Sequence, residues 1–443
     1  MKRTGIRASV RTLTKTPALA PMLALLLVAP SLSVCFSANA QVIDVVVGPS
    51  DEPSETPRTR SKRGISLGGF SIPLGDRDRV SSLRDRDVPE ANGNELVFTT
   101  TGDPAEIAAA AGLDLVEAVP LRSLSTTLVV VSLRKGDSPI EAQRRLARIA
   151  GVSDPQPNGL FQAMAGTAAP LPKRFAIHGL NAPRQTVMGA ADAPTDRAIA
   201  MIDTVVAIDH EALRGARLAQ TIFVADRSPR AHGTAVAGLI AGTSAEVPGV
   251  ARGAKLLNFA AFTERKDGIA VATTANLAKA LDAAAMAKPD ALSLAFGGRD
   301  DRLLGLLVDE IDRRGVCIVA AAGNGGEQRR VPFPANHPAV LAVTAIDNAL
   351  KPYAHATHGD RIDVAAVGVD VFVPVPDGAR SAYRRMSGTS MATALVAGAL
   401  LRSPACAPGP APTMLRAQAR AAARDLGAPG DDPVFGAGLF LPP

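Results

Sequence analysis

The sequence predicts an α/β fold whose main part is a doubly wound, mainly parallel sheet, preceded by a small α+β domain. From about residue 174 onward, short and unbroken apolar runs alternate with helical patterns. Such runs suit strands that are buried on both faces of a parallel sheet, and their alternation with helices is typical of doubly wound folds. The predicted strands are 198–202, 255–260, 291–295, 316–322, 340–345 and 362–365, and the predicted helices are 234–241, 274–287 and 303–314.

The small domain is expected between residues 93 and 165 and has a β-α-β-β-α-β pattern. Asp103 and Pro104 predict the start of its first helix, because an N-cap carboxylate and a first-turn proline both favour one. Ser138-Pro139-Ile140-Glu141 has the capping-box pattern of a second helix start. This order of elements is ferredoxin-like, with strands expected at 95–100, 115–121, 127–133 and 160–162.

The first 40 residues are predicted to be a secretory signal peptide. Basic residues precede an uncharged apolar run over 17–36, and Ala38-Asn39-Ala40 is an A-x-A exit, so cleavage is expected after Ala40. A retained membrane anchor is the alternative, because the run is nearly long enough to span a bilayer, but Pro21 and Pro30 argue against it. The protein is therefore expected to be secreted or periplasmic, with no membrane attachment after signal cleavage.

Charge and composition restrict the partners of the chain. Residues 41–92 mix acidic and basic side chains with Pro, Ser and Gly and show little apolar periodicity, which predicts a disordered linker. The net charge of +6 is concentrated before residue 40, where five basic residues lie and no acidic residue does. The rest of the chain is nearly neutral and offers no broad basic surface, so a nucleic-acid partner is not expected.

Four polar residues are expected near the carboxyl ends of the predicted strands, where active sites of doubly wound sheets lie. Asp203 and Asn324 each follow a strand, and His232 opens a helix. Ser390 stands in the first turn of a buried, small-residue helix, where the partial positive charge of the helix end and its own backbone N–H favour a nucleophile. Each residue taken singly also has an ordinary structural explanation, as a cap, a turn residue or a core histidine.

Together these motifs resemble those of subtilisin-like serine proteases, the subtilases or peptidase S8 family. The chain has Asp203-Thr204 after a strand, then His232-Gly233-Thr234-Ala235-Val236-Ala237-Gly238, then Ala321-Ala322-Gly323-Asn324, and finally Gly388-Thr389-Ser390-Met391-Ala392. The order Asp, His, Ser separates this fold from other triad enzymes. The resemblance spans about residues 174–439, and the peptidase domain is placed at 170–443.

The resemblance implies a serine endopeptidase that acts on polypeptides through an acyl-enzyme. Ser390 is the implied nucleophile, His232 the base, Asp203 the orienting carboxylate and Asn324 the oxyanion donor. The implied substrate-binding residues are Leu294, Ala295, Phe296, Gly297, Ala322 and Gly323. No cofactor is expected and no metal ligand is assigned. Calcium stays an open alternative that the sequence does not assign, since the loops that carry it in many relatives are short here. Specificity stays open, because Pro332 favours an apolar pocket whereas Arg329 and Arg330 favour acidic residues.

The small domain resembles the inhibitor-I9-like propeptide of the same proteases. This implies a zymogen in which the chain's own propeptide is an intramolecular inhibitor, and in which self-cleavage falls between Phe161 and Pro170. A stable accessory domain is the alternative. Cys317 and Cys406 are expected at the same end of the sheet, so one disulfide is a hypothesis that the sequence leaves open.

Val205 departs from the family pattern, in which glycine usually follows Asp-Thr. A β-branched residue argues against a positive φ, so the turn is expected to differ and to move the carboxylate of Asp203. Two alternatives therefore stand beside the main prediction, namely a catalytically impaired binding protein on the same fold and a membrane-tethered processing protease. His355 and His358 invite a metal interpretation, but a surface loop is the expectation.

Overall fold

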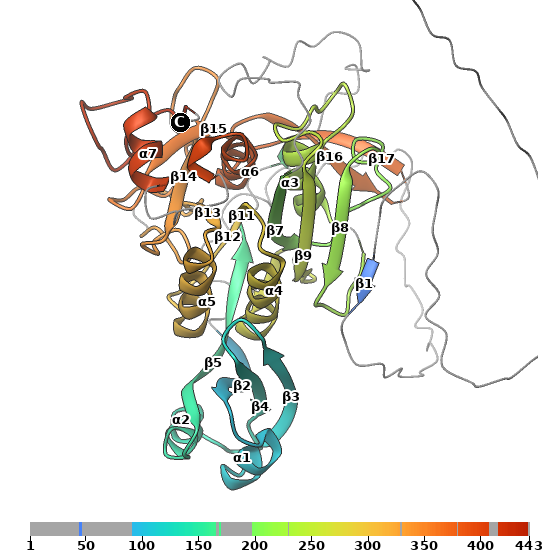
Figure 1. The fold of residues 1–443 in the computed structure, drawn as a ribbon, viewed down its shortest axis with the longest axis vertical. Helices are drawn as coiled ribbons and strands as arrows, with labels where there is room; N and C mark the ends of the chain where they lie inside the picture. The colour runs from blue at the N-terminus through green and yellow to red at the C-terminus, as the bar shows by residue number, and fades with distance from the viewer. Residues whose placement is uncertain are drawn as a thin grey trace, which may run out of the picture. The chain divides into compact units, whose positions relative to one another are not determined.

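The computed structural model describes residues 44–46, 91–164, 168–169 and 197–441, except 229, 328–329, 379 and 407–414. The predicted signal peptide, almost all of the predicted linker and Arg329 lie outside these residues. The described chain contains the two predicted regions, a small α+β unit and a larger α/β unit (Figure 1).

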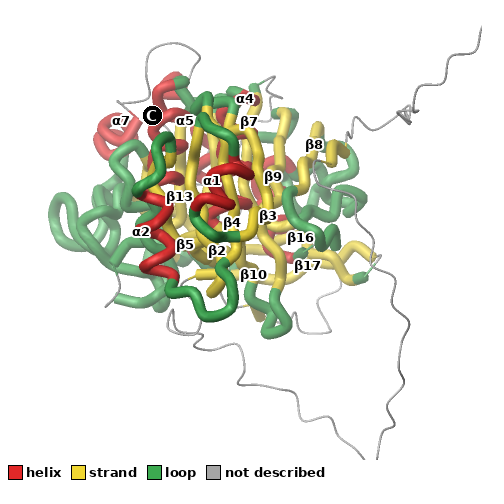
Figure 2. The backbone as a smooth tube through the Cα atoms, turned by 90° about the horizontal axis from the view of Figure 1, so that it is seen from below, coloured by secondary structure: helices red, strands yellow, loops and turns green. Residues whose placement is uncertain are grey.

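A parallel sheet forms the centre of the larger unit and confirms the predicted fold class. Its strands follow the order β15-β14-β13-β11-β7-β9, with β8 beside β9, and all these neighbours pair in parallel (Figures 1 and 2). The strands are β7 (Ala198–Thr204), β8 (Arg217–Ile222), β9 (Lys255–Glu264), β11 (Ala291–Leu294), β13 (Cys317–Ala321), β14 (Val340–Ile346) and β15 (Val364–Val367).

Helices cover both faces of this sheet, because alternate strand residues are apolar on both sides. Ile199 and Met201 of β7 share a core with α3 (Ala231–Ala241) and α6 (Thr389–Leu400). The intervening residues Ala200 and Ile202 pack on the opposite face, which α4 (Thr274–Ala287) and α5 (Arg302–Arg313) cover. A last helix, α7 (Leu415–Ala422), follows a short 3₁₀ turn at Pro404–Cys406.

The small unit has the predicted β-α-β-β-α-β order. It consists of β2 (Ala91–Thr100), α1 (Pro104–Ala110), β3 (Asp114–Leu121), β4 (Thr126–Ser132), α2 (Pro139–Ala147) and β5 (Val152–Ala163), with the antiparallel order β5-β2-β4-β3. Asp103 caps α1 as predicted, by accepting hydrogen bonds from two backbone N–H groups. The capping box at Ser138 is not formed, because the Ser138 side chain makes no cap hydrogen bond, and α2 begins at Pro139 without it.

The strand β5 is much longer than predicted and leaves the small unit to enter the larger one. Its end pairs antiparallel with β10 (Ala270–Thr273) on one side and with β12 (Phe296–Gly297) on the other. After residue 164, β6 (Ala168–Ala169) pairs with β17 of a hairpin formed by β16 (Val371–Asp377) and β17 (Arg380–Met386). The chain before and after residue 164 is therefore held by different strands of the larger unit.

One short segment of the predicted linker forms a strand. Asp44–Val46 forms β1 and pairs in parallel with β8, the edge strand of the large sheet (Figure 1). Val42 to Val47 is almost wholly β-branched, and an edge strand offers unpaired backbone groups to such a segment. The low apolar content of the surrounding residues hid this local signal in the sequence.

Cys317 and Cys406 form a disulfide, with their Cα atoms 5.8 Å apart. Cys317 begins β13, and Cys406 lies in the 3₁₀ turn that follows α6. The bridge that the sequence left open is thus present. It ties the segment after the Ser390 helix to the start of a central strand, and it closes a loop of 89 residues.

Candidate active site

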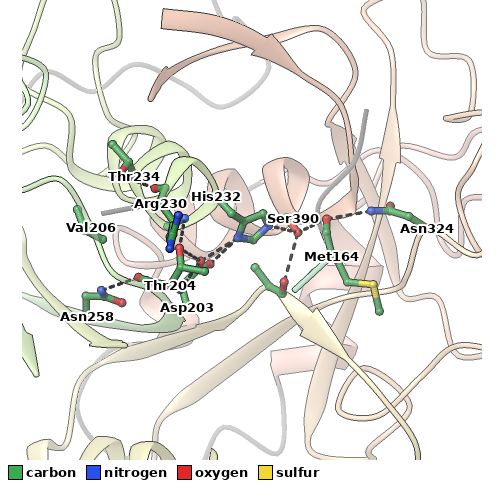
Figure 3. A network of polar contacts seen from close by, with 12 residues as sticks. Met164, Asp203, Thr204, Val206, Arg230, His232, Thr234, Asn258, Asn324 and Ser390 are labelled. Carbon is green, nitrogen blue, oxygen red and sulfur yellow. Dashed lines mark hydrogen bonds and ion pairs between the residues drawn. The ribbon is translucent and has the colours of Figure 1, made fainter. Parts of the chain in front are cut away.

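Asp203, His232 and Ser390 meet at the carboxyl end of the large sheet, as the sequence predicted (Figure 3). His232 Nδ1 lies 2.8 Å from Asp203 Oδ1 and 3.0 Å from Oδ2. His232 Nε2 lies 3.0 Å from Ser390 Oγ. All three residues are buried, which leaves the imidazole between a carboxylate and a hydroxyl with little solvent to screen them.

Three different elements carry these side chains, and close packing aligns them. Asp203 lies near the end of β7, His232 in the first turn of α3, and Ser390 in the first turn of α6. Gly233 lets α3 approach β7, because a Cβ at this position would lie 2.5 Å from the carbonyl oxygen of Thr204. The His-Gly sequence is therefore required by the close contact between helix and strand.

The environment of His232 favours its protonated form. Burial lowers the pKa of the imidazole, but the charge of Asp203, the hydrogen bond to Asp203 and a hydrogen bond with the Met164 backbone together raise it by more, so that the pKa lies above its ordinary value. A base of this kind can take a proton from Ser390 and hold it as an imidazolium beside Asp203.

The carbonyl group of Met164 occupies the site. Its oxygen lies 2.8 Å from Ser390 Oγ and accepts a hydrogen bond of 2.9 Å from Asn324 Nδ2, while the Met164 N–H donates to the carbonyl of Ala295 (Figure 3). Thr389 orients the amide of Asn324, because both its N–H and its hydroxyl donate to Asn324 Oδ1 at 3.0 Å. Met164 and Thr389 were not singled out in the sequence, although Met164 lies within the predicted 161–170 window.

The predicted substrate-binding residues fall into two groups. Ala295 binds the N–H of Met164, and Phe296 and Gly297 pair with Ala163 and Gln162. Leu294 lies within the central sheet, between Ile202 and Ala320.

Ala322 and Gly323 form the second group and support neighbouring loops. The Ala322 N–H donates to the carbonyl of Val343, and the Gly323 carbonyl accepts from Thr357. The Gly323 N–H donates to Thr389 Oγ1, which adds to the network around Asn324. These two residues thus lie next to Asn324, with both N–H groups and the Gly323 carbonyl hydrogen-bonded.

The side chain of Met164 lies beside Gly297, and Pro332 borders the same point. A Cβ on Gly297 would lie 2.1 Å from the terminal methyl of Met164 and 2.8 Å from Pro332 Cγ. Three residues earlier, Phe161 packs edge-on against Phe296 and Phe333, with ring centroids 6.2 Å apart in each pair. The surroundings of Met164 and Phe161 are apolar at these contacts.

Val205 does not disturb the carboxylate as the sequence led us to expect. The residue is not in the left-handed region, and its side chain is buried against Ile222 and Ala260. Asp203 nevertheless reaches His232 at 2.8 Å. The turn therefore accommodates valine without drawing the carboxylate away from the imidazole.

A metal site does not emerge from the described residues, since they contain no group of three or more His, Cys, Asp and Glu side chains that could hold an ion. His355, one of the two histidines considered above, packs edge-on against Tyr353. Within the same described ranges, none of the helices has the length and apolar character needed to cross a membrane.

The fold and the site together define a serine-type endopeptidase. Residues 196–438, more than half of the chain, match the Subtilase family (peptidase S8), and the chain belongs to this family. It is 29% identical to subtilisin DY of Bacillus licheniformis over 252 residues, which are 55% of this chain and 88% of the relative. It is 33% identical to subtilisin E of Bacillus subtilis over 174 residues, which are 38% of this chain and 44% of the relative.

Solved structures support the same fold. Fervidolysin from Fervidobacterium pennivorans, described as a keratinolytic enzyme related to subtilisin, superposes with a TM-score of 0.67 at 22% identity, covering 81% of this chain and 61% of its own. A point mutant of the protease domain of PatA superposes with a TM-score of 0.50 at 30% identity, covering 56% of this chain and 94% of its own.

Proposed function

We propose that the chain is an exported serine endopeptidase zymogen that first cleaves its own chain after Met164 and then hydrolyses polypeptides. The observation that carries this proposal is the position of the Met164 carbonyl, which is bound between Ser390 Oγ and Asn324 Nδ2. A peptide carbonyl held beside a buried serine, with a donor on its oxygen, has the arrangement needed for nucleophilic attack. The apolar N-terminal run with its A-x-A exit supports export.

In the first chemical step, Ser390 Oγ attacks the carbonyl carbon of Met164 while His232 Nε2 takes the hydroxyl proton. Asp203 holds the imidazole with Nδ1–H facing the carboxylate and stabilises the imidazolium that forms. Asn324 Nδ2 and the Ser390 backbone N–H donate to the oxyanion. Loss of one side-chain donor of this kind lowers the rate about 10²–10³-fold, a magnitude known from a subtilisin.

The tetrahedral intermediate then collapses. The bond between Met164 and Ala165 breaks, and His232 gives its proton to the leaving amine of Ala165, which leaves Met164 as an ester on Ser390. A water molecule, deprotonated by His232, hydrolyses this ester. The products are a small domain that ends in a carboxylate at Met164, a new N-terminus at Ala165, and a regenerated Ser390 hydroxyl.

The contacts of the small domain support its role as an inhibitor after cleavage. Asp282 of α4 accepts from both the N–H and the hydroxyl of Ser123, and Lys279 pairs with Glu117 at 3.0 Å. Asn158 Oδ1 accepts the N–H of Ala275 in the first turn of α4. Together with the strand pairs of β5, these contacts do not depend on the bond after Met164. The domain is therefore expected to stay in the cleft once that bond is cut.

The test is N-terminal sequencing and intact-mass analysis of the purified full chain. We expect a large fragment that begins at Ala165 and a small fragment that ends at Met164, and we expect a fluorophosphonate probe to label the large fragment once the small domain is removed. A cut elsewhere between 161 and 170 would refute the assignment to Met164. An intact chain that never reacts with the probe would favour the impaired binding protein instead.

Gly297 is predicted to set the size of the primary pocket. Because a Cβ there would meet both the Met164 methyl and Pro332, we expect Gly297→Ala to lower kcat/KM for peptides cleaved after Met by about 10–200-fold. Peptides cleaved after Ala should lose much less. The matched control is Gly305→Ala, since a Cβ on Gly305 meets nothing within 4 Å. Equal losses for both peptides would show that Gly297 does not line the pocket.

A further inference from the structure

Two buried amide side chains, Gln220 and Asn258, lie next to the turn that carries Asp203, and the reaction proposed above makes no use of them. They stand directly opposite each other on β8 and β9, and they are 4% and 1% exposed. Asn258 Nδ2 donates to Gln220 Oε1 at 2.7 Å. Side-chain amides are seldom buried without a specific partner, so this pair calls for an explanation.

Both amides bind the backbone on either side of Val205. Asn258 Nδ2 also donates to the carbonyl oxygen of Thr204 at 3.1 Å, and Gln220 Oε1 accepts the N–H of Val206 at 2.8 Å (Figure 3 shows Asn258, Thr204 and Val206). The carbonyl of Val205 itself accepts from the N–H of Arg230. Three successive residues of the turn are thus tied to fixed partners.

The backbone at this point cannot rely on the sheet ladder. The pairing of β7 with β9 shifts register between Asp203 and Thr204, so the ladder is interrupted where the catalytic carboxylate emerges. Such irregularities re-aim side chains near active sites, but they leave backbone groups without ladder partners. The next residue, Val205, is not in the left-handed region and its side chain is buried, so the turn is held by the partners of its backbone groups.

The hydrogen bonding of the Gln220–Asn258 pair is incomplete, so fold stability alone does not explain why the pair is buried. Asn258 Oδ1 is buried and has no hydrogen-bond partner within the described residues, although its Nδ2 group makes two contacts. An unsatisfied buried acceptor destabilises a fold, and an apolar pair would avoid this penalty. Retention of a partly unsatisfied amide at this place points to a role in the site.

We propose that Gln220 and Asn258 are positioning residues that fix the turn after Asp203 and thereby hold the carboxylate of Asp203 in place. This inference rests on the proposed function, since it assigns the pair to the same reaction. The link to the chemistry is Thr204, whose N–H donates to Asp203 Oδ1 at 2.7 Å and whose Oγ1 accepts from Gly233 at 2.9 Å. A shift of Thr204 therefore moves both the carboxylate and the start of the helix that bears His232.

The test compares steady-state kinetics of wild type, Asn258→Leu and Gln220→Met on a short peptide cleaved after Met. Each replacement keeps a similar volume and removes the hydrogen bonds to the turn. Active sites are titrated with the fluorophosphonate probe, so that only folded enzyme is counted. We expect kcat to fall about 10–100-fold with KM changed less than about twofold, because misplacement by about 1 Å has effects of this size.

Rescue separates positioning from a general loss of packing. Gln220→Glu keeps an oxygen that can accept from the Val206 N–H and from Asn258 Nδ2, so it should retain most of the kcat that Gln220→Met loses. The matched control is Thr344→Val, which removes another buried hydroxyl without a partner in the described chain, on β14, and should leave kcat unchanged. If one variant fails to fold, the kinetics of the other are compared with wild type. If neither variant gives titratable enzyme, the pair has a structural role and the proposal is overturned.

The remaining outcomes are equally decisive. Unchanged kcat in the two variants, a rise in KM that accounts for the loss, or an equal loss of kcat in Gln220→Glu and Gln220→Met would each overturn the positioning role while leaving the proposed function intact. A wild-type protein that neither labels nor hydrolyses would overturn the proposed function, and the positioning role with it.

Discussion

Replacing Ser390 with alanine should leave the chain uncleaved and lower peptide hydrolysis by about 10⁶-fold, the effect of removing this group in a subtilisin. The reason is that the hydroxyl is the atom expected to bond to the carbonyl carbon, and no other hydroxyl in the described chain lies between His232 Nε2 and the Met164 carbonyl. The measurement is the rate of appearance of the fragment that begins at Ala165, followed by mass spectrometry on the purified variant alone.

Ser387→Ala is a suitable control for this experiment. Ser387 lies three residues before the nucleophile and is also buried, but its hydroxyl accepts from the N–H of Asp370 and does not touch His232. This variant should be processed nearly as fast as wild type. Self-cleavage of the Ser390→Ala chain at the wild-type rate would contradict the assigned nucleophile, whereas cleavage only after addition of active enzyme would be consistent with it.

The central sheet could be predicted because the residues of each strand themselves show the apolar pattern of a buried strand. Ile199, Met201 and their neighbours are apolar on both faces, which only a doubly covered parallel strand requires. The strand β5 was underestimated because Pro155 and Pro157 interrupt its pattern, and proline normally argues against a strand. It is a strand because its partners lie in both units of the chain, which no local pattern records.

The site residues also divide into those that the sequence could predict and those that it could not. Asp203, His232, Asn324 and Ser390 could be proposed from the sequence because each stands in a short motif at the end of a predicted element. The supporting residues could not, since their roles arise from contacts between distant elements. Thr389 matters through Asn324, 65 residues away, and Asn258 matters through Thr204, 54 residues away. A lone asparagine in an apolar strand was the available signal for the latter.

Asp203→Asn is expected to lower kcat about 10⁴-fold, as the same change does in another triad protease, and also to move the pH profile. Burial lowers the pKa of His232, whereas the charge of Asp203, its hydrogen bond and a hydrogen bond with the Met164 backbone raise it to above its ordinary value. The base must be neutral to accept the Ser390 proton, so wild-type activity should disappear as the pH falls through that raised pKa. Without the carboxylate charge, burial dominates and the pKa falls below its ordinary value.

The acid limb of kcat/KM in Asp203→Asn should therefore lie at lower pH than in wild type, even though the maximum rate is much smaller. Asp209→Asn is the matched control, because Asp209 is an exposed carboxylate in the loop that follows β7 and its removal changes the net charge equally. An acid limb that stays in place in Asp203→Asn would mean that this carboxylate does not raise the pKa of His232. A limb that moves equally in both variants would trace the effect to net charge. Of the two carboxylates, Asp203 is the one that contacts the imidazole, at 2.8 Å from His232 Nδ1, so only its loss should shift the limb through a direct interaction.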